Sequence, residues 1–168
     1  MGLNLKNLSK VTTRSGRSIK KIRRRSDLAI LWSAEEYIFQ NGALASGVTA
    51  SGFTLQDGYL FAYSDDDSEN LISIQNIDMT NYSKADIELD YRADADYGSA
   101  SVKYGIDGYT SNELEDKYNR VSTTITLDIT SYVGSHFIGF RLYCRNDSDE
   151  PTYGAWANVW IKSIKLYN

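Results

Sequence analysis

Near the carboxyl end of the chain, aromatic, amide and cationic side chains alternate with apolar ones. Val159 and Ile161 have the spacing of core-facing positions in a half-buried strand, so the residues between them should project outward. The outward set is Trp156, Asn158, Trp160 and Lys162. Aromatic rings stack on the apolar C–H side of a sugar ring, while amide and ammonium groups donate hydrogen bonds to its hydroxyls. The pattern therefore predicts a glycan-binding surface.

A second strand has two side chains in the same outward phase. They are Arg141 and Tyr143, and we expect them to belong to the same glycan site. The alternative is that these aromatic residues pack under a loop or against a neighbouring subunit, because a large ring gains from any apolar contact. Mutation of Trp160 to alanine should separate these two interpretations.

Catalytic chemistry lacks most of its usual parts. His136 is the only histidine and Cys144 the only cysteine. The sequence therefore cannot form an intrachain disulfide or a metal centre with several histidines. A nucleophile–histidine pair could be built only on His136, and no motif supports one. Glycoside hydrolysis needs only two carboxylates at the right separation, but 22 acids make chance pairs certain. We therefore predict no catalytic residue, no bound metal and no cofactor, with His136 and Cys144 in structural roles.

Three acidic runs could offer oxygen ligands to calcium: 65–69, 94–96 and 147–150. Each lacks the spacing of oxygen ligands that a calcium-binding loop requires, so solvated turns are the simpler interpretation.

The elements that would position these groups are strands. The chain has 168 residues, with 13 Tyr, 5 Phe, 3 Trp and a single Pro, a composition that favours strands joined by polar turns. Short apolar or alternating runs predict strands at 37–39, 59–63, 71–77, 85–91, 100–106, 121–129, 136–145 and 159–166. The step between Ile161 and Ile164 predicts a bulge near Lys162-Ser163. Residues 112–119 are expected to form a loop.

The charge is divided unevenly along the chain. Residues 1–33 hold nine Lys/Arg against one Asp, a balance of +8, which leaves nine bases against 21 acids, or −12, in the rest. We predict two parts: a basic anchoring arm at 1–33 and an all-β sandwich at 34–168. The residues expected to anchor the arm are Lys20, Lys21, Arg23, Arg24, Arg25, Leu31 and Trp32.

The apolar segment from Leu28 to Trp32 is expected to add as a strand to a neighbouring chain or to pack at a trimer axis. A flexible tail is the alternative. The arm is expected to dock on acidic protein surface rather than on nucleic acid, because the acidic body would oppose a polyanion. No run approaches the roughly 18 apolar residues of a membrane span, so no membrane partner is expected.

Two stretches resemble galactose-binding-like jelly rolls, the fold of many carbohydrate-binding modules. They are Leu127-Asp128-Ile129-Thr130-Ser131-Tyr132-Val133-Gly134 and Val159-Trp160-Ile161-Lys162-Ser163-Ile164-Lys165-Leu166-Tyr167. The resemblance implies an antiparallel jelly-roll β-sandwich over roughly residues 35–168. The family often carries paired acids at its closing bulge, where this chain has Lys162-Ser163, so calcium is not expected there.

The arm resembles amino-terminal segments of tailed-bacteriophage structural proteins, in Ile19-Lys20-Lys21-Ile22 followed by Ile30-Leu31-Trp32. This resemblance implies a non-enzymatic virion protein of the tail, baseplate or head fibre, made in the host bacterial cytoplasm. Its expected partners are further copies of itself, in a homo-oligomer of which a trimer is one form, neighbouring virion proteins and a host-surface glycan. Two alternatives remain: a standalone carbohydrate-binding module, and a capsid decoration protein without a ligand.

Overall fold

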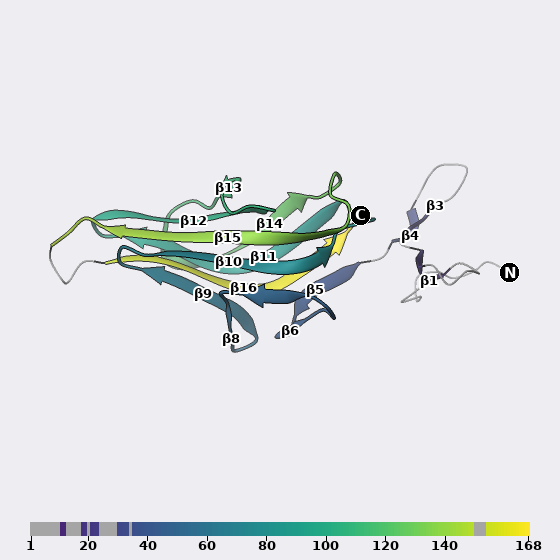
Figure 1. Ribbon diagram of the computed structural model, residues 1–168, viewed down its shortest axis with the longest axis horizontal. Coiled ribbons are helices and arrows are strands. Elements are labelled where there is room, and N and C mark those ends of the chain that lie inside the picture. The colour runs from purple at the N-terminus through teal and green to yellow at the C-terminus, as the bar shows by residue number, and fades with distance from the viewer. Residues whose placement is uncertain (1–10, 13–17, 20, 24–29, 34, 150–153) are drawn as a thin grey trace.

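The computed structural model is a sandwich of two antiparallel β-sheets (Figure 1). It describes residues 11–12, 18–19, 21–23, 30–33, 35–149 and 154–168. The predicted all-β fold is confirmed, and its strands alternate apolar and polar residues as a sheet with one buried face requires. Among the described residues, no helix is long and apolar enough to cross a membrane.

One sheet has five strands in the order β13-β12-β15-β10-β7. Their bounds are β13 (Asn112–Glu113), β12 (Gly98–Ile106), β15 (Ser135–Asn146), β10 (Glu69–Asp78) and β7 (Thr49–Ser51). The long central strand β15 pairs with β12 on one side and β10 on the other. The strands predicted around 71–77, 100–106 and 136–145 are therefore confirmed, and the structure shows that they are neighbours in one sheet.

The other sheet has seven strands, built around β16 (Ala155–Tyr167) and β11 (Lys84–Ala95). The remaining members are β14 (Lys117–Asp128), β5 (Glu36–Gln40), β6 (Ala43–Leu44), β8 (Thr54–Gln56) and β9 (Tyr59–Asp65). β11 pairs with β16 over its whole length. The other edge of β16 is shared: residues 156–161 pair with β9 and residues 163–166 pair with β5.

The core lies between the sheets, where side chains from alternate positions of both inner faces meet. Phe140 is completely buried and packs edge-on against Phe53 at a ring-centroid distance of 6.4 Å. Other side chains without exposed surface are Ile72, Ile74, Leu142, Ile87, Leu89, Val159 and Ile161. Burial of each such side chain contributes roughly 1.5–3 kcal/mol relative to exposure, which makes this double layer the main source of stability.

Local sequence chemistry sets several turns and the predicted bulge. Asn41-Gly42 joins β5 to β6 and Asp57-Gly58 joins β8 to β9, and all four residues have positive φ, between 51° and 83°. Two consecutive positive φ angles give the hairpin turn whose twist matches its strands. The β11–β16 register shifts between Glu88 and Leu89, opposite Ser163 and Ile161, so the bulge expected near Lys162-Ser163 is confirmed.

The prediction that residues 112–119 form a loop is wrong for most of these residues. Asn112 and Glu113 form β13, which pairs with β12, and Lys117 already belongs to β14, where it lies opposite Ala93. This polar segment lies at sheet edges, where strands need no apolar alternation because backbone pairing with one neighbour holds them.

The acidic turns are exposed to solvent, as expected, and three of their carboxylates also accept hydrogen bonds from backbone amides at strand ends. Asp66 Oδ1 accepts a hydrogen bond from the Ala155 amide at 2.9 Å, and Asp67 Oδ1 accepts one from the Asn146 amide at 2.9 Å. Asp96 Oδ2 accepts one from the Gly154 amide at 3.2 Å. These carboxylates satisfy backbone donors that the sheets leave unpaired. Across the part of the chain that the structure describes, no three His, Cys, Asp or Glu side chains are grouped to hold a metal.

Four short strands of the arm belong to neither sheet. β1 (Val11–Thr12) pairs with β2 (Ser18–Ile19), and β3 (Lys21–Arg23) pairs with β4 (Ile30–Ser33). Within the predicted apolar segment, Ile30 and Trp32 are thus paired inside their own chain, opposite Arg23 and Ile22. Of the expected anchoring residues, Lys20, Arg24 and Arg25 lie outside the described residues. The arm's anchoring role and the boundary at residue 33 stay predictions.

Candidate functional site

The outer surface of the seven-stranded sheet carries a concentration of aromatic side chains. We call it the aromatic face, and define it by Tyr59, Phe61, Tyr63, Tyr118, Trp156 and Trp160. The residues lie at alternate positions of β9, β14 and β16, with Leu60, Ala62, Val159 and similar residues between them buried in the core. Period-two alternation therefore places all six rings on the same side of the sheet.

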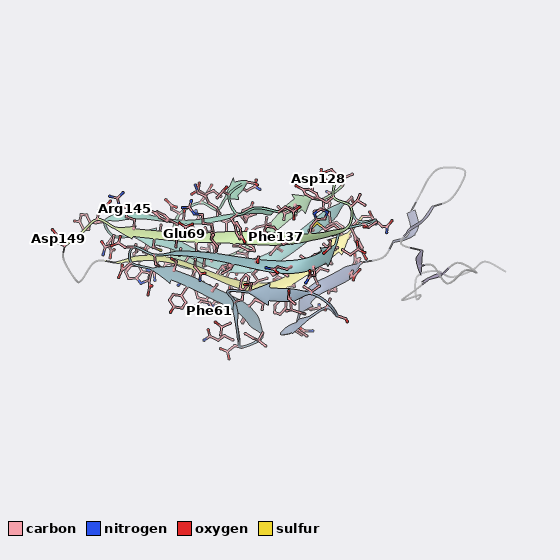
Figure 2. The ribbon with its side chains drawn as sticks, viewed as in Figure 1. Phe61, Glu69, Asp128, Phe137, Arg145 and Asp149 are labelled. Atoms are coloured by element: carbon pink, nitrogen blue, oxygen red, sulfur yellow. The ribbon has the colours of Figure 1, made fainter. Side chains whose placement is uncertain are left out.

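Strand pairing brings three of these rings into a stack. Trp160 lies opposite Phe61 in the β9–β16 register, and their ring centroids are 5.2 Å apart with planes inclined by 27°. Phe61, labelled in Figure 2, also stacks on Tyr63 at 5.9 Å and 16°. Stacked pairs of this kind add roughly 0.5–1.5 kcal/mol beyond the area that they bury.

Two arginines cover the tryptophan rings. The guanidinium of Arg120 lies 4.2 Å from the ring centre of Trp160, and that of Arg92 lies 4.5 Å from the ring centre of Trp156. Arg120 reaches Trp160 from β14, across β11, whereas Phe61 reaches it from β9, which pairs with the other edge of β16. Trp160 is therefore already in contact with a guanidinium and an aromatic ring, and it supports the surface more than it offers a free stacking platform.

The rings with free surface are tyrosines. Tyr63 is 54% exposed and Tyr118 is 66% exposed. Tyr63 lies opposite Asn158, Asn158 lies opposite Arg92, and the Arg92 guanidinium is 5.6 Å from the Tyr118 ring centre. Two exposed rings thus flank an amide and a guanidinium in one row across the sheet, which spans roughly 14 Å at the usual strand spacing.

Asp90 holds the cations of this surface in place. Its Oδ2 accepts hydrogen bonds from Arg120 Nε and Nη2 at 2.9 and 2.7 Å, and its Oδ1 lies 2.5 Å from Lys162 Nζ. Ser122 Oγ donates a further hydrogen bond to Oδ1. Burial of Asp90 disfavours its charge, but the hydrogen bonds from Lys162, Ser122 and Arg120 outweigh that cost, so its pKa lies below the ordinary value.

The structure brings together four of the six predicted glycan-binding residues. Trp156, Asn158, Trp160 and Lys162 all project from the outer side of β16, as expected. Arg141 and Tyr143 do not join them, because β15 belongs to the other sheet and their outward phase points to the opposite side of the sandwich. There Arg141 Nε donates to Glu69 Oε1 at 2.9 Å.

Sequence reasoning missed most of the partners on this face. Tyr59, Phe61 and Tyr63 alternate within a predicted strand, and that signal was available. No sequence pattern links Arg120 and Tyr118 to this face. Their strand, β14, lies three places away from β9 in the sheet, and residue spacing along the chain does not reveal such contacts.

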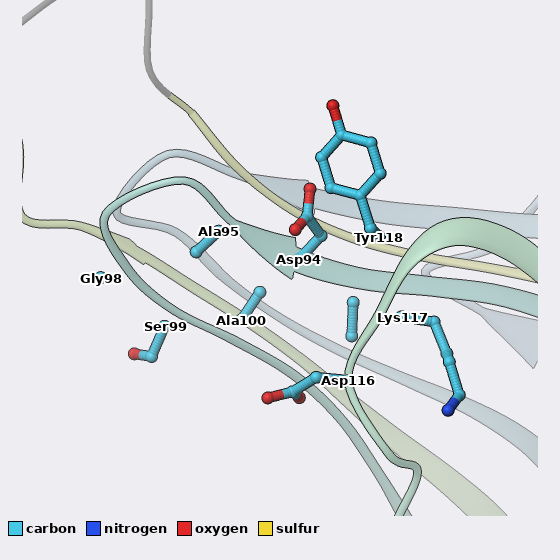
Figure 3. Close-up of a pocket in the computed structure, with 9 residues that line it drawn as sticks. Asp94, Ala95, Gly98, Ser99, Ala100, Asp116, Lys117 and Tyr118 are labelled. Carbon is cyan, nitrogen blue, oxygen red and sulfur yellow. The ribbon is translucent and has the colours of Figure 1, made fainter.

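Three hollows are lined by residues of this sheet, and the first of them is also lined by β12 of the other sheet. One of about 180 Å³ lies at the end near Tyr118, where Figure 3 shows Asp94, Asp116 and Lys117 around it. A larger hollow of about 390 Å³ lies beside Tyr59 and Lys162. The third, of about 200 Å³, adjoins the second.

His136 and Cys144 lie away from the aromatic face. His136 Nδ1 is 2.6 Å from Asp107 Oδ2, a contact that raises the pKa of this imidazole. Burial raises the pKa of the Cys144 thiol to about 11, so the thiol stays protonated at neutral pH and is a poor nucleophile.

Comparisons with known proteins find similarity at the level of fold. No family model matches the chain, and no curated protein matches it. Among solved structures, the chain is similar to a single-residue variant of the family 29 carbohydrate-binding module CBM29-2 (TM-score 0.48, 16% identity, 80% of this chain and 91% of that one). It is also similar to another such variant complexed with cellulohexaose (TM-score 0.45, 16%, 80% and 90%). A third similar structure is a family 29 module from Piromyces equi (TM-score 0.41, 15%, 80% and 89%).

Proposed function

We propose that this chain is a non-catalytic glycan-binding module whose ligand lies across the outer surface of the seven-stranded sheet. The observation that carries the proposal is the row Tyr63, Asn158, Arg92 and Tyr118, in which two rings more than half exposed flank two polar groups. Exposed rings stack on the C–H faces of sugar rings, and the amide and guanidinium between them donate to hydroxyls.

The network beneath this row makes it rigid before any ligand arrives. Arg92 is held by Asp94 at 2.9 Å and lies over Trp156, while Asp90 fixes Arg120 against Trp160. Side chains that are already ordered lose less rotamer entropy on binding, so more of the contact energy is available as affinity.

Mutation of either exposed tyrosine is expected to weaken glycan binding about tenfold. Loss of one stacking platform removes roughly 1–2 kcal/mol, and each 1.4 kcal/mol corresponds to a factor of ten. The measurement is a glycan array followed by affinity electrophoresis in polysaccharide gels, for wild type, Tyr63→Ala and Tyr118→Ala. Because both rings are exposed, the thermal unfolding midpoints should stay close to wild type.

Tyr143→Ala is the matched control, because this ring lies on the outer side of the other sheet. Its binding should equal that of wild type. A loss in Tyr143→Ala together with wild-type binding by Tyr63→Ala and Tyr118→Ala would place the site on the opposite sheet. A wild-type chain that binds no glycan would refute the proposal.

The finer assignment, a virion protein anchored by residues 1–33, stays a prediction from the sequence. The exposed rings Tyr63 and Tyr118 equally suit a subunit contact, which is the capsid-decoration alternative. Light scattering on the full chain and on a chain starting at Ala34 tests assembly. We expect an oligomer for the full chain and a folded monomer without the arm. A monomer in both cases would remove the self-assembly part of the prediction.

A further inference from the structure

The 390 Å³ hollow lies at a seam in the seven-stranded sheet, where β16 changes its partner from β9 to β5. The bulge at Lys162-Ser163 occurs at the same point, so neither strand fills the gap. We call this hollow the seam pocket. Its lining residues are Tyr37, Gln40, Asn41, Asp57, Gly58, Tyr59, Glu88, Lys162 and Ser163.

Two hairpin turns form one wall of the seam pocket. The Asn41-Gly42 and Asp57-Gly58 turns come from different hairpins, yet a Cβ built on Gly42 would lie only 3.3 Å from the Cα of Gly58. The turns therefore contact each other through their glycines, which have no side chains to separate them. This contact holds the amide of Asn41 and the carboxylate of Asp57 beside the same opening.

Several polar groups around the seam pocket are unused. In the described structure, the side chains of Gln40, Asn41 and Asp57 make no hydrogen bond, and Glu88 accepts one weak hydrogen bond, from Ser163 Oγ at 3.4 Å. The carboxylate of Asp90 on the same sheet, by contrast, is fully engaged. Free acceptors in a pocket with a tyrosine on each side, Tyr37 and Tyr59, are the groups that a polyhydroxylated ligand needs.

The charge of the seam pocket is negative. Its only cation among the lining residues is Lys162, whose ammonium is 2.5 Å from Asp90 and thus compensates a charge outside the pocket. Asp57 and Glu88 have no ion-pair partner within 4.0 Å among the described residues. The adjoining 200 Å³ hollow shares Tyr37, Glu88 and Ser163 with it, so the acidic Glu88 faces both.

We infer that the seam pocket is the selectivity subsite of the glycan site: it binds one neutral sugar unit through hydroxyls donating to Glu88 and Asp57, and it rejects uronic-acid units. Hydrogen bonds from hydroxyls to carboxylates are among the stronger neutral–ionic pairs. A sugar carboxylate in the same place would face two like charges, while the lining cation, Lys162, is already paired with Asp90. The inference rests on the proposed function, because the tyrosine row supplies the rest of the affinity.

The test compares neutral polymers with their oxidised forms. The full-length chain is run by affinity electrophoresis against galactomannan and a soluble β-1,4-glucan ether, and against the same two polymers oxidised at C6 to uronic acids. The variants are Glu88→Gln and Asp57→Asn, which keep side-chain size; asparagine also tolerates the positive φ of position 57. Glu69→Gln is the control, because Glu69 lies on the other sheet.

We expect wild type to bind a neutral polymer at least tenfold more tightly than its oxidised form. Glu88→Gln and Asp57→Asn should each weaken neutral binding at least fivefold and reduce that ratio, whereas Glu69→Gln should change neither. The inference is overturned if wild type binds the neutral and oxidised polymers equally. It is also overturned if Glu88→Gln and Asp57→Asn both bind the neutral polymers as tightly as wild type does. In either case, Tyr63→Ala still tests the proposed glycan site separately. Retention of only the oxidised polymers also overturns the inference. Failure of the wild-type chain to bind either neutral polymer overturns the inference, and the proposed function fails with it only if the glycan array also shows no bound glycan.

Discussion

Replacement of Asp90 by alanine is expected to lower the free energy of unfolding by about 2 kcal/mol and to weaken glycan binding. Loss of one partner from a buried ionic network leaves the opposite charges without compensation, which costs roughly 3–5 kcal/mol when all partners are buried. Here Asp90 is 7% exposed, but the side chain of Arg120 is 45% exposed and recovers part of its hydration. The expected loss in the free energy of unfolding is therefore about 2 kcal/mol, below the range for a fully buried network.

Binding should fall in the Asp90→Ala variant because Asp90 orients groups that a ligand would contact. Without it, Arg120 is no longer fixed over Trp160, and Lys162 loses the anchor that keeps it at the edge of the seam pocket. Urea unfolding measures the stability loss, and affinity electrophoresis measures the binding loss. Glu69→Ala, which removes an exposed ion pair on the other sheet, should leave both almost unchanged. If Asp90→Ala unfolds with the same free energy as wild type, the Asp90 network makes no net contribution to stability.

The same carboxylate gives a pH dependence with a definite sign. The pKa of Asp90 is lowered in the folded state, so its ionised form stabilises the fold above the ordinary aspartate pKa of 3.8. That contribution is lost as the pH falls from this value through the lower folded-state pKa. The stability difference between wild type and Asp90→Ala should therefore be constant near neutral pH and shrink below about pH 4. A difference that grows in acid would contradict the assignment.

Replacement of Gly98 by alanine is expected to destabilise the fold by about 3 kcal/mol. Gly98 has a φ of 124°, and a Cβ there would lie 2.0 Å from the carbonyl oxygen of Arg145. The backbone conformation alone costs a non-glycine residue roughly 1–3 kcal/mol, and the overlap forces β12 away from β15, which adds a similar amount. Thermal and urea unfolding of the variant measure the sum.

Gly47→Ala separates the two contributions. Gly47 also has a positive φ, 84°, but a Cβ there would have no atom within 4 Å. This variant should lose only the conformational part, about 1 kcal/mol. Equal losses at both positions would show that β12 and β15 adjust without cost, contrary to the close approach at Arg145.

Local patterns in the sequence were sufficient for most of the fold. Alternation of apolar and polar residues gives the inner face of each long strand, because a strand turns every second side chain to the same side. Asn41-Gly42 and Asp57-Gly58 have compositions that favour turns, because these residues tolerate positive φ. The irregular step from Ile161 to Ile164 identifies the bulge, since one extra residue shifts the phase.

The sequence by itself thus determined the all-β class, the outward direction of Trp156 and Trp160, and the two places where the chain reverses around the seam pocket. Only the tertiary structure decided which outward faces coincide. Arg141 and Tyr143 have the predicted phase but belong to the other sheet, whereas Arg120 reaches Trp160 across β11 and Tyr118 contacts Arg92. The physical reason is that phase is a property of one strand, while strand order depends on long-range pairing and packing that no local pattern records.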